Sequence, residues 1–161
     1  MAIELSTAGV KVGWGIETTT GTKPTAYTRI RGVKSIPSLN PEPETIEVTD
    51  LNDTEFKRYV DGLKDMGGAL AFTCNLTQQF MDDWDTVMQA YNTGKETGLR
   101  LWLQIFIPGL AKGFFMAANP SPLGISEIGV SAALETDAYL TPTFVEGWDT
   151  KVTVTEPAAL P

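Results

Sequence analysis

Apolar and polar residues alternate over several short stretches of this chain, the pattern of β-strands that bury one face. The alternation predicts strands over Ala8–Glu17, Tyr27–Ile36 with a break near Gly32, Ala69–Leu76 and Leu99–Ile107. In the last of these, one face is purely aliphatic: Leu99, Leu101, Leu103, Ile105 and Ile107. The opposite face is partly aromatic, with Arg100, Trp102, Gln104 and Phe106. We therefore expect both faces of this strand to be covered.

The C-terminal third continues the alternation, with breaks at proline and glycine. It predicts a hairpin partner at Phe114–Asn119, a strand at Tyr139–Glu146 and a short strand at Asp149–Thr155. Between them, Ile125–Thr136 is expected to form a long strand with an apolar inner face of Ile128, Val130, Ala132 and Leu134.

Three residues inside the predicted strands limit what can lie beside them. Gly13 and Gly15 occupy the outer face of the first strand, where glycine suggests a bulge or the close approach of another backbone. Pro142 lacks a backbone donor and implies an edge or a bulge.

The apolar period changes after Leu76 from two residues to that of a helix. One stripe contains Phe80, Trp84, Val87, Met88 and Tyr91. Thr77 or Asn75 can cap the start of this helix, and Gly94 can end it. Asp82 and Asp83 are expected to be solvated near its positive end.

These patterns give about eight strands and one long helix. They predict a mainly β, α+β fold: an antiparallel β-sandwich or partly closed barrel with one flanking helix and a long extended loop. We expect one domain over residues 1–161, with a leader at 1–7 and a tail at 156–161.

The long loop is residues 35–68, a polar excursion that we call the arm. It contains one β-like run, Thr45–Thr49, and then mixed charge without a sustained apolar period. Its apolar side chains argue against disorder, and a domain of this size has little room to bury them. We predict that the arm is an assembly interface carried by Ile46, Glu47, Val48, Thr49, Asp50, Leu51, Phe56, Tyr59 and Leu63.

Composition removes most catalytic chemistry. The chain has no histidine and one cysteine, Cys74, which falls on an apolar strand face. It therefore offers no Ser-His or Cys-His pair and no cysteine-based zinc site, and we expect no enzyme activity, metal or cofactor. The run from Asp50 to Glu55 resembles a calcium loop only weakly. The net charge of −8 opposes binding to nucleic acid, and no apolar run is long enough to cross a membrane.

Three segments, two from the arm region and one from the predicted helix, carry a resemblance to a known family. GVKSIPSLNPEPETIEVTDLND, YVDGLKDMGG and TQQFMDDWDTVMQAY resemble the tail tube proteins of long-tailed bacteriophages, and so does the leader AGVKVGWGIETTTGTKPTAYTRI. The likeness extends to about Gly94 and is strongest in IEVTDL and GLKDMGG.

The resemblance implies a β-sandwich with one helix that forms hexameric rings stacked into a hollow tube in a virion tail. The arm would reach a neighbouring subunit or ring. Implied partners are further copies of the chain and the tape measure, tail terminator and distal tail proteins, with assembly in the cytoplasm of the bacterial host. DNA would pass through without specific binding, helped by an acidic lumen in which we place Glu127 and Glu135, on one face of the strand Ile125–Thr136.

Two alternatives stay open. The inner tubes of contractile tails and of a bacterial injection system share this fold. A small carbohydrate-binding β-sandwich could instead use Trp14, Trp102 or Trp148 as a stacking platform, Trp148 being expected to be exposed, but it would leave the arm without a purpose.

Overall fold

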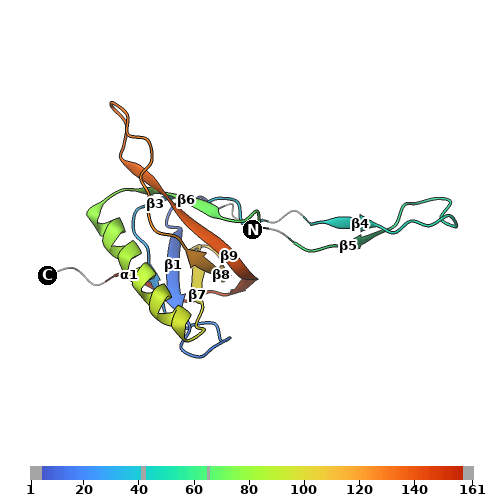
Figure 1. Ribbon diagram of the computed structural model, residues 1–161, viewed down its shortest axis with the longest axis horizontal. Coiled ribbons are helices and arrows are strands. Elements are labelled where there is room, and N and C mark those ends of the chain that lie inside the picture. The colour runs from blue at the N-terminus through green and yellow to red at the C-terminus, as the bar shows by residue number, and fades with distance from the viewer. Residues whose placement is uncertain (1–4, 41–42, 65, 158–161) are drawn as a thin grey trace.

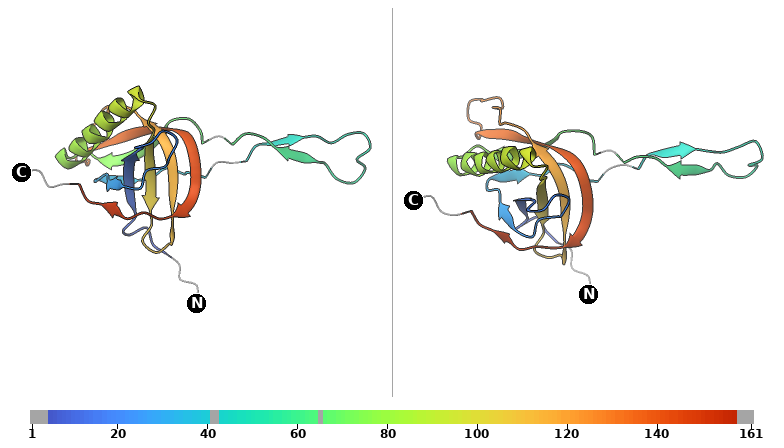
Figure 2. Two further views of the ribbon diagram at one scale, coloured as in Figure 1. Left: turned by 90° about the horizontal axis from the view of Figure 1, so that it is seen from below. Right: turned by 60° about the horizontal axis from the view of Figure 1, so that its bottom comes forward.

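A single curved sheet of eight strands wraps into a half-barrel around the core, in a computed structural model that describes residues 5–40, 43–64 and 66–157 (Figures 1 and 2). The predicted leader and tail lie partly outside these residues. The strands of the large sheet are β1 (Lys11–Ile16), β2 (Tyr27–Arg29), β3 (Val33–Ser35), β6 (Leu70–Asn75), β7 (Leu101–Phe106), β8 (Lys112–Pro120), β9 (Glu135–Thr150) and β10 (Val154–Thr155). A separate hairpin contains β4 (Thr45–Glu47) and β5 (Tyr59–Asp61), and the helix is α1 (Gln78–Glu96).

The strand order across the sheet is β10-β2-β1-β7-β8-β9-β6-β3. Neighbours are antiparallel except β10 and β2, which run parallel. The mainly β class and the partly closed barrel are therefore confirmed. The two outermost strands, β10 and β3, are short and leave the half-barrel open.

Strand β7 lies in the middle of this order, and both of its faces are covered, as predicted. Leu101, Leu103 and Ile105 join the main core beneath α1. Trp102 packs on the opposite face with a second cluster around Tyr27 and Phe115. Burial on both faces explains why this strand has a nearly continuous apolar sequence.

The glycines of β1 permit close approach on its outer face. A Cβ on Gly15 would lie 2.5 Å from the carbonyl oxygen of Ala26, and one on Gly13 would lie 3.0 Å from Val154. The predicted backbone approach is thus confirmed at Gly15. Pro142 pairs with Ala118 beside a register shift, which confirms the bulge, although β9 is an interior strand.

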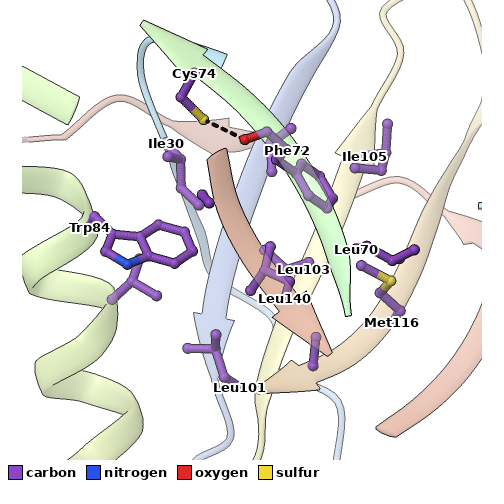
Figure 3. Close-up of a cluster of buried hydrophobic side chains, with 14 of the residues drawn as sticks. Ile30, Leu70, Phe72, Cys74, Trp84, Leu101, Leu103, Ile105, Met116 and Leu140 are labelled. Atoms are coloured by element: carbon purple, nitrogen blue, oxygen red, sulfur yellow. Dashed lines mark hydrogen bonds between the residues drawn. The ribbon is translucent and has the colours of Figure 1, made fainter. Parts of the chain in front are cut away.

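Helix α1 covers one opening of the half-barrel (Figure 2). Of the predicted stripe, Phe80, Trp84 and Val87 are buried, and Met88 and Tyr91 are half-buried against the core. The Thr77 Oγ accepts a hydrogen bond from the Phe80 N–H at 3.2 Å, as expected of an N-cap. In Figure 3 the Trp84 indole points from α1 toward Ile30 and the strand side chains of the core. Cys74 is buried in the same cluster, which confirms its predicted place on an apolar face. No helix in the described ranges combines the length and hydropathy needed to cross a membrane.

Two details of the helix differ from the sequence prediction. Gly94 does not end it, because α1 continues to Glu96 and Thr97 is its C-cap. Gly94 is buried where α1 meets β1, and a Cβ there would lie 2.9 Å from Ile16. Its small size therefore serves packing.

Asp83 is the second difference, since it is not a solvated first-turn carboxylate. It is only 5% exposed, and its two oxygens accept from the Arg31 Nε at 3.0 Å and Nη2 at 2.8 Å. The Arg31 backbone N–H also donates to it, at 2.9 Å. Asp83 therefore fixes the segment between β2 and β3 against the helix.

The predicted strand Ile125–Thr136 is wrong. Residues 121–134 form an exposed loop, and β9 begins only at Glu135 and continues through both later predicted segments to Thr150. β9 pairs with β6 on one side and β8 on the other, so the place between those two strands is taken and residues 125–134 lie outside the sheet. Their alternation has no buried face to match. Asp149–Thr155 is likewise divided, because Asp149 and Thr150 end β9 and only Val154 and Thr155 form β10.

Candidate assembly surfaces

The arm is a two-stranded hairpin that projects far from the body (Figures 1 and 2). β4 and β5 pair with Ile46 opposite Val60 and Glu47 opposite Tyr59. Further bonds extend the ladder at both ends, from Val48 N to Arg58 O at 2.9 Å and from Gly62 N to Glu44 O at 2.7 Å. The second strand was missed in the sequence because its three residues are too few to show a period.

The loop at the arm tip, residues 48–58, is braced by one cation. The Arg58 Nε donates to Asp53 at 2.7 Å and its Nη2 to Asp50 at 3.2 Å. The Asp53 carboxylate also accepts from the Asp50 backbone N–H at 2.9 Å, and Thr49 Oγ accepts from the Arg58 N–H at 2.8 Å. The tip therefore has a defined shape, and the carboxylates of the weak calcium-like run bind an arginine. The described residues contain no cluster of three or more ligands that could hold a metal.

The arm exposes large apolar side chains. Leu51 and Phe56 at the tip are 103% and 81% exposed, and Leu63 nearer the base is 86% exposed. The other predicted interface residues of the arm are also exposed, apart from half-buried Thr49: Ile46, Glu47, Val48, Asp50 and Tyr59. In the isolated chain none of these apolar groups has a buried environment, so the arm gains nothing from them without a partner.

A groove lies where the arm leaves the body. Its volume is about 1040 Å³. Leu39 and Met66 of the arm base line one side, and Phe114, Val145 and Trp148 of β8 and β9 line another. Sequence reasoning missed this groove, because only pairing of β8 with β9 brings Phe114 opposite Trp148.

Loop 121–134 is a second apolar projection, on another side of the body from the arm (Figure 1). Ile125, Ile128 and Val130 are 68%, 67% and 98% exposed. Its N-terminal part is fixed by bonds from the Trp84 indole to Ser121 O and from Thr136 Oγ to Gly124 O, each 3.0 Å. Pro120, Pro122 and the glycines at 124 and 129 were the available signals for a loop.

The two predicted lumen carboxylates do not share a strand face. Glu127 is exposed in loop 121–134, whereas Glu135 is the first residue of β9 and forms an ion pair with Lys34. The geometric argument that placed them together is therefore wrong, and their orientation toward a lumen stays a prediction.

Lys23 ties the loop after β1 to the wall of the groove. Its Nζ donates to Asp149 at 2.6 Å and to Glu146 at 3.1 Å, and lies 4.0 Å from the centre of the Phe115 ring. The hydrogen bond from Lys23 is the main reason that the pKa of Asp149 is lowered to about 2. These bonds fix the C-terminal half of β9, which lines the groove, to the loop after β1.

Glu17, the residue after β1, joins the end of β1 to the start of β7. It is 1% exposed and accepts from the Arg100 N–H at 2.8 Å and from the Trp102 indole at 3.0 Å. Burial acts to raise the pKa of this carboxyl, but the hydrogen bonds from Arg100 and Trp102 outweigh it and the pKa is lowered.

The tryptophans do not form a stacking platform. Trp102 is 2% exposed and Trp14 is half-buried against the main core. Only Trp148 is open, at 53%, as the sequence predicted. The carbohydrate-binding alternative thus has one available aromatic face out of three.

Solved structures with this fold include components of the anti-feeding prophage. One chain, from a six-fold symmetrised cryo-EM structure of its baseplate, superposes with a TM-score of 0.59 at 10% identity and covers 91% of this chain and 97% of its own length. Another, from the cap that terminates its tube, gives 0.54 at 10% identity, covering 94% and 95%. The likeness establishes the fold. No family model and no curated protein matches the sequence.

Proposed function

We propose that this chain is a ring-forming structural subunit of the tube of a phage-tail-like particle, and not an enzyme. The observation that carries the proposal is the arm: an ordered hairpin whose large apolar side chains, Leu51 and Phe56 above all, have no burial in the isolated chain. An ordered apolar projection of this kind is explained by docking on a neighbour.

The open half-barrel supports the same proposal. Among the described residues, the end strands β10 and β3 have one neighbouring strand each. Their outer backbone groups can therefore pair with a strand of another chain. Six copies joined through such edges would form a closed ring, and rings engaged through their arms would form a stack. The six-fold symmetry reported for the anti-feeding prophage baseplate agrees with this arrangement.

Two kinds of particle could contain such a tube. The likeness to anti-feeding prophage components favours the inner tube of a contractile injection system over the tail tube of a long-tailed phage. In either particle, the proposed partners are further copies of this chain and the proteins that start, measure and terminate the tube.

Negative-stain microscopy of the purified chain tests the proposal. Concentrating the protein should give hollow rings or tubes with six-fold end views. A chain that stays monomeric by light scattering over the whole concentration range, alone and with the other tail proteins of its particle, contradicts it.

An acidic lumen is the finer part of the proposal. The net charge of −8 would repel a polyanion in transit, and Glu127 and Glu135 are the residues we assign to the bore. Replacing both with lysine should leave tubes intact but slow delivery of their contents and make the tubes retain added DNA. Lysine-substituted tubes that deliver normally and bind no DNA place both residues elsewhere.

A further inference from the structure

No described residue of the chain fills the groove at the arm base. The hairpin extends away from the body in every view, so its tip lies far from the place where the arm begins (Figures 1 and 2). Trp148 is 53% exposed there, and Phe114 packs against it edge to face with ring centres 5.7 Å apart. The groove therefore offers an aromatic surface to another molecule.

The groove is almost free of net charge. Among the described residues that line it, only Lys64 and Glu146 are charged, and Glu146 is 3.1 Å from Lys23. This matters because a chain with a net charge of −8 repels its own copies over most of its surface. A nearly neutral apolar groove is a place where that repulsion is small.

The arm tip has complementary properties. Leu51 and Phe56 are fully or largely exposed, while Arg58 pairs with both Asp50 and Asp53 beside them and offsets one of their two negative charges. Because Arg58 already braces the tip, little conformational freedom remains to be lost when the tip enters a pocket. The apolar tip and the apolar groove are thus two unsatisfied surfaces of one chain, held apart by the length of the hairpin.

We propose that this groove receives the arm tip of a second copy, with Leu51 and Phe56 packed against Phe114 and Trp148. The inference rests on the proposed function and adds the docking site to it. The contact joins two different surfaces, so each copy that inserts its tip also offers an empty groove to the next. Such a head-to-tail contact continues without limit, which is what growth of a stack requires.

Hydrogen exchange on the wild-type chain tests the docking site without any substitution. Exchange is compared between free chain, below the concentration at which it assembles, and assembled tubes. Residues 48–58 and residues 143–148 should both slow by about tenfold or more. Slowing at the tip with no change at 143–148 means that the arm docks elsewhere and overturns the inference while leaving the proposed function standing. If no assembly forms at all, the proposed function fails and the inference with it.

A disulfide test adds proximity. The only native cysteine is buried, so Phe56→Cys combined with Thr143→Cys, a lining residue of the groove, introduces the sole accessible thiols. Mild oxidation of tubes should give a ladder of covalent multimers on a non-reducing gel. The matched control pairs Phe56→Cys with Gln89→Cys on the exposed face of α1, which should give at least about fivefold less ladder, as expected for thiols that are not held at disulfide distance. Equal ladders in the two variants, or none in well-formed tubes, overturn the inference. If Phe56→Cys prevents assembly, Leu51→Cys replaces it.

Discussion

The body and the arm of this chain treat large apolar side chains in opposite ways. In the body, Trp84 and Phe80 are 2% and 0% exposed beneath the half-barrel. In the arm, Phe56 and Leu51 are 81% and 103% exposed, although they lie in a loop that Arg58 braces at the end of a paired hairpin. The core of the body buries its own hydrophobic groups and so specifies a fold. The arm leaves its large apolar groups exposed, which is why we propose that they meet a partner.

The ion pairs divide along the same line. In the body, Asp83 is almost fully enclosed and binds Arg31 through both oxygens. In the arm, Asp53 and Asp50 bind Arg58 in an exposed loop. The first contact holds two elements together, whereas the second only shapes a tip. Four experiments test this division, in order of decreasing expected effect.

Shortening the arm should abolish assembly and leave the body unchanged. Glu47 and Tyr59 are paired across the hairpin, so replacing residues 48–58 with Asn-Gly closes β4 and β5 with a two-residue turn. Because the removed residues make no part of the core clusters, the melting temperature should move by no more than about 2 °C. Microscopy and thermal unfolding together measure both effects. Tubes formed by the shortened chain would show that the tip is not needed.

Truncating an aromatic side chain should have opposite results in the two regions. Trp84→Ala leaves a cavity in the core and should destabilise the chain by about 3–5 kcal/mol. Phe56→Ala should change the free energy of unfolding by less than about 0.5 kcal/mol, because the ring is 81% exposed in the single chain. It should weaken assembly, because we propose that the ring is buried against a neighbour. Urea titration of the unassembled chain measures the first quantity and sedimentation the second. Similar stabilities for the two variants would remove the distinction between body and arm.

Removing a carboxylate should also destabilise the chain more in the body than in the arm, with a smaller loss of unfolding free energy than the aromatic truncation causes. Asp83→Ala leaves the Arg31 backbone N–H and guanidinium without their acceptor and should cost about 1.5–3 kcal/mol, the usual range for hydrogen bonds to a charged group. Asp53→Ala breaks an exposed pair and should cost less than about 1 kcal/mol. Equal losses in urea titration would mean that Asp83 is no more important than a surface charge.

The smallest effect concerns acid. The pKa of Asp149 is lowered from 3.8 to about 2, chiefly by its hydrogen bond from Lys23. A lowered pKa means that this contact stabilises the fold fully above pH 3.8 and is lost as the pH falls toward 2. The melting temperature of the wild type should therefore fall more steeply over that interval than that of Asp149→Asn. Parallel curves for the two proteins would show that Asp149 gains nothing from Lys23 in the folded state.

Much of the body could be predicted from the sequence. The strict alternation in Leu99–Ile107 and the stripe from Phe80 to Tyr91 each reflect a local period, and the elements there, β7 and α1, follow it closely. Gly15 in a strand predicted the close approach of another backbone, and the carbonyl group of Ala26 lies there. The sequence predicted the arm as a long polar segment whose apolar residues have no place in the core, and the residues of its tip and strands are indeed exposed. In each case the signal lies within a few consecutive residues, which is the range over which side-chain direction is set by the backbone period.

The tertiary structure decided what depends on distant residues. Ile125–Leu134 alternates as well as a true strand does, yet it is a loop, because β9 already occupies the place between β6 and β8. The sequence suggested that Asp83 and Gly94 lie at the ends of the helix and are exposed or terminate it. In the structure Asp83 binds Arg31 and Gly94 packs against Ile16, and both partners are distant in the sequence. The groove exists only because β8, β9 and both ends of the arm converge on it. Local sequence determines the direction of a side chain. Pairing between strands far apart in the chain determines whether that side chain finds a packing partner.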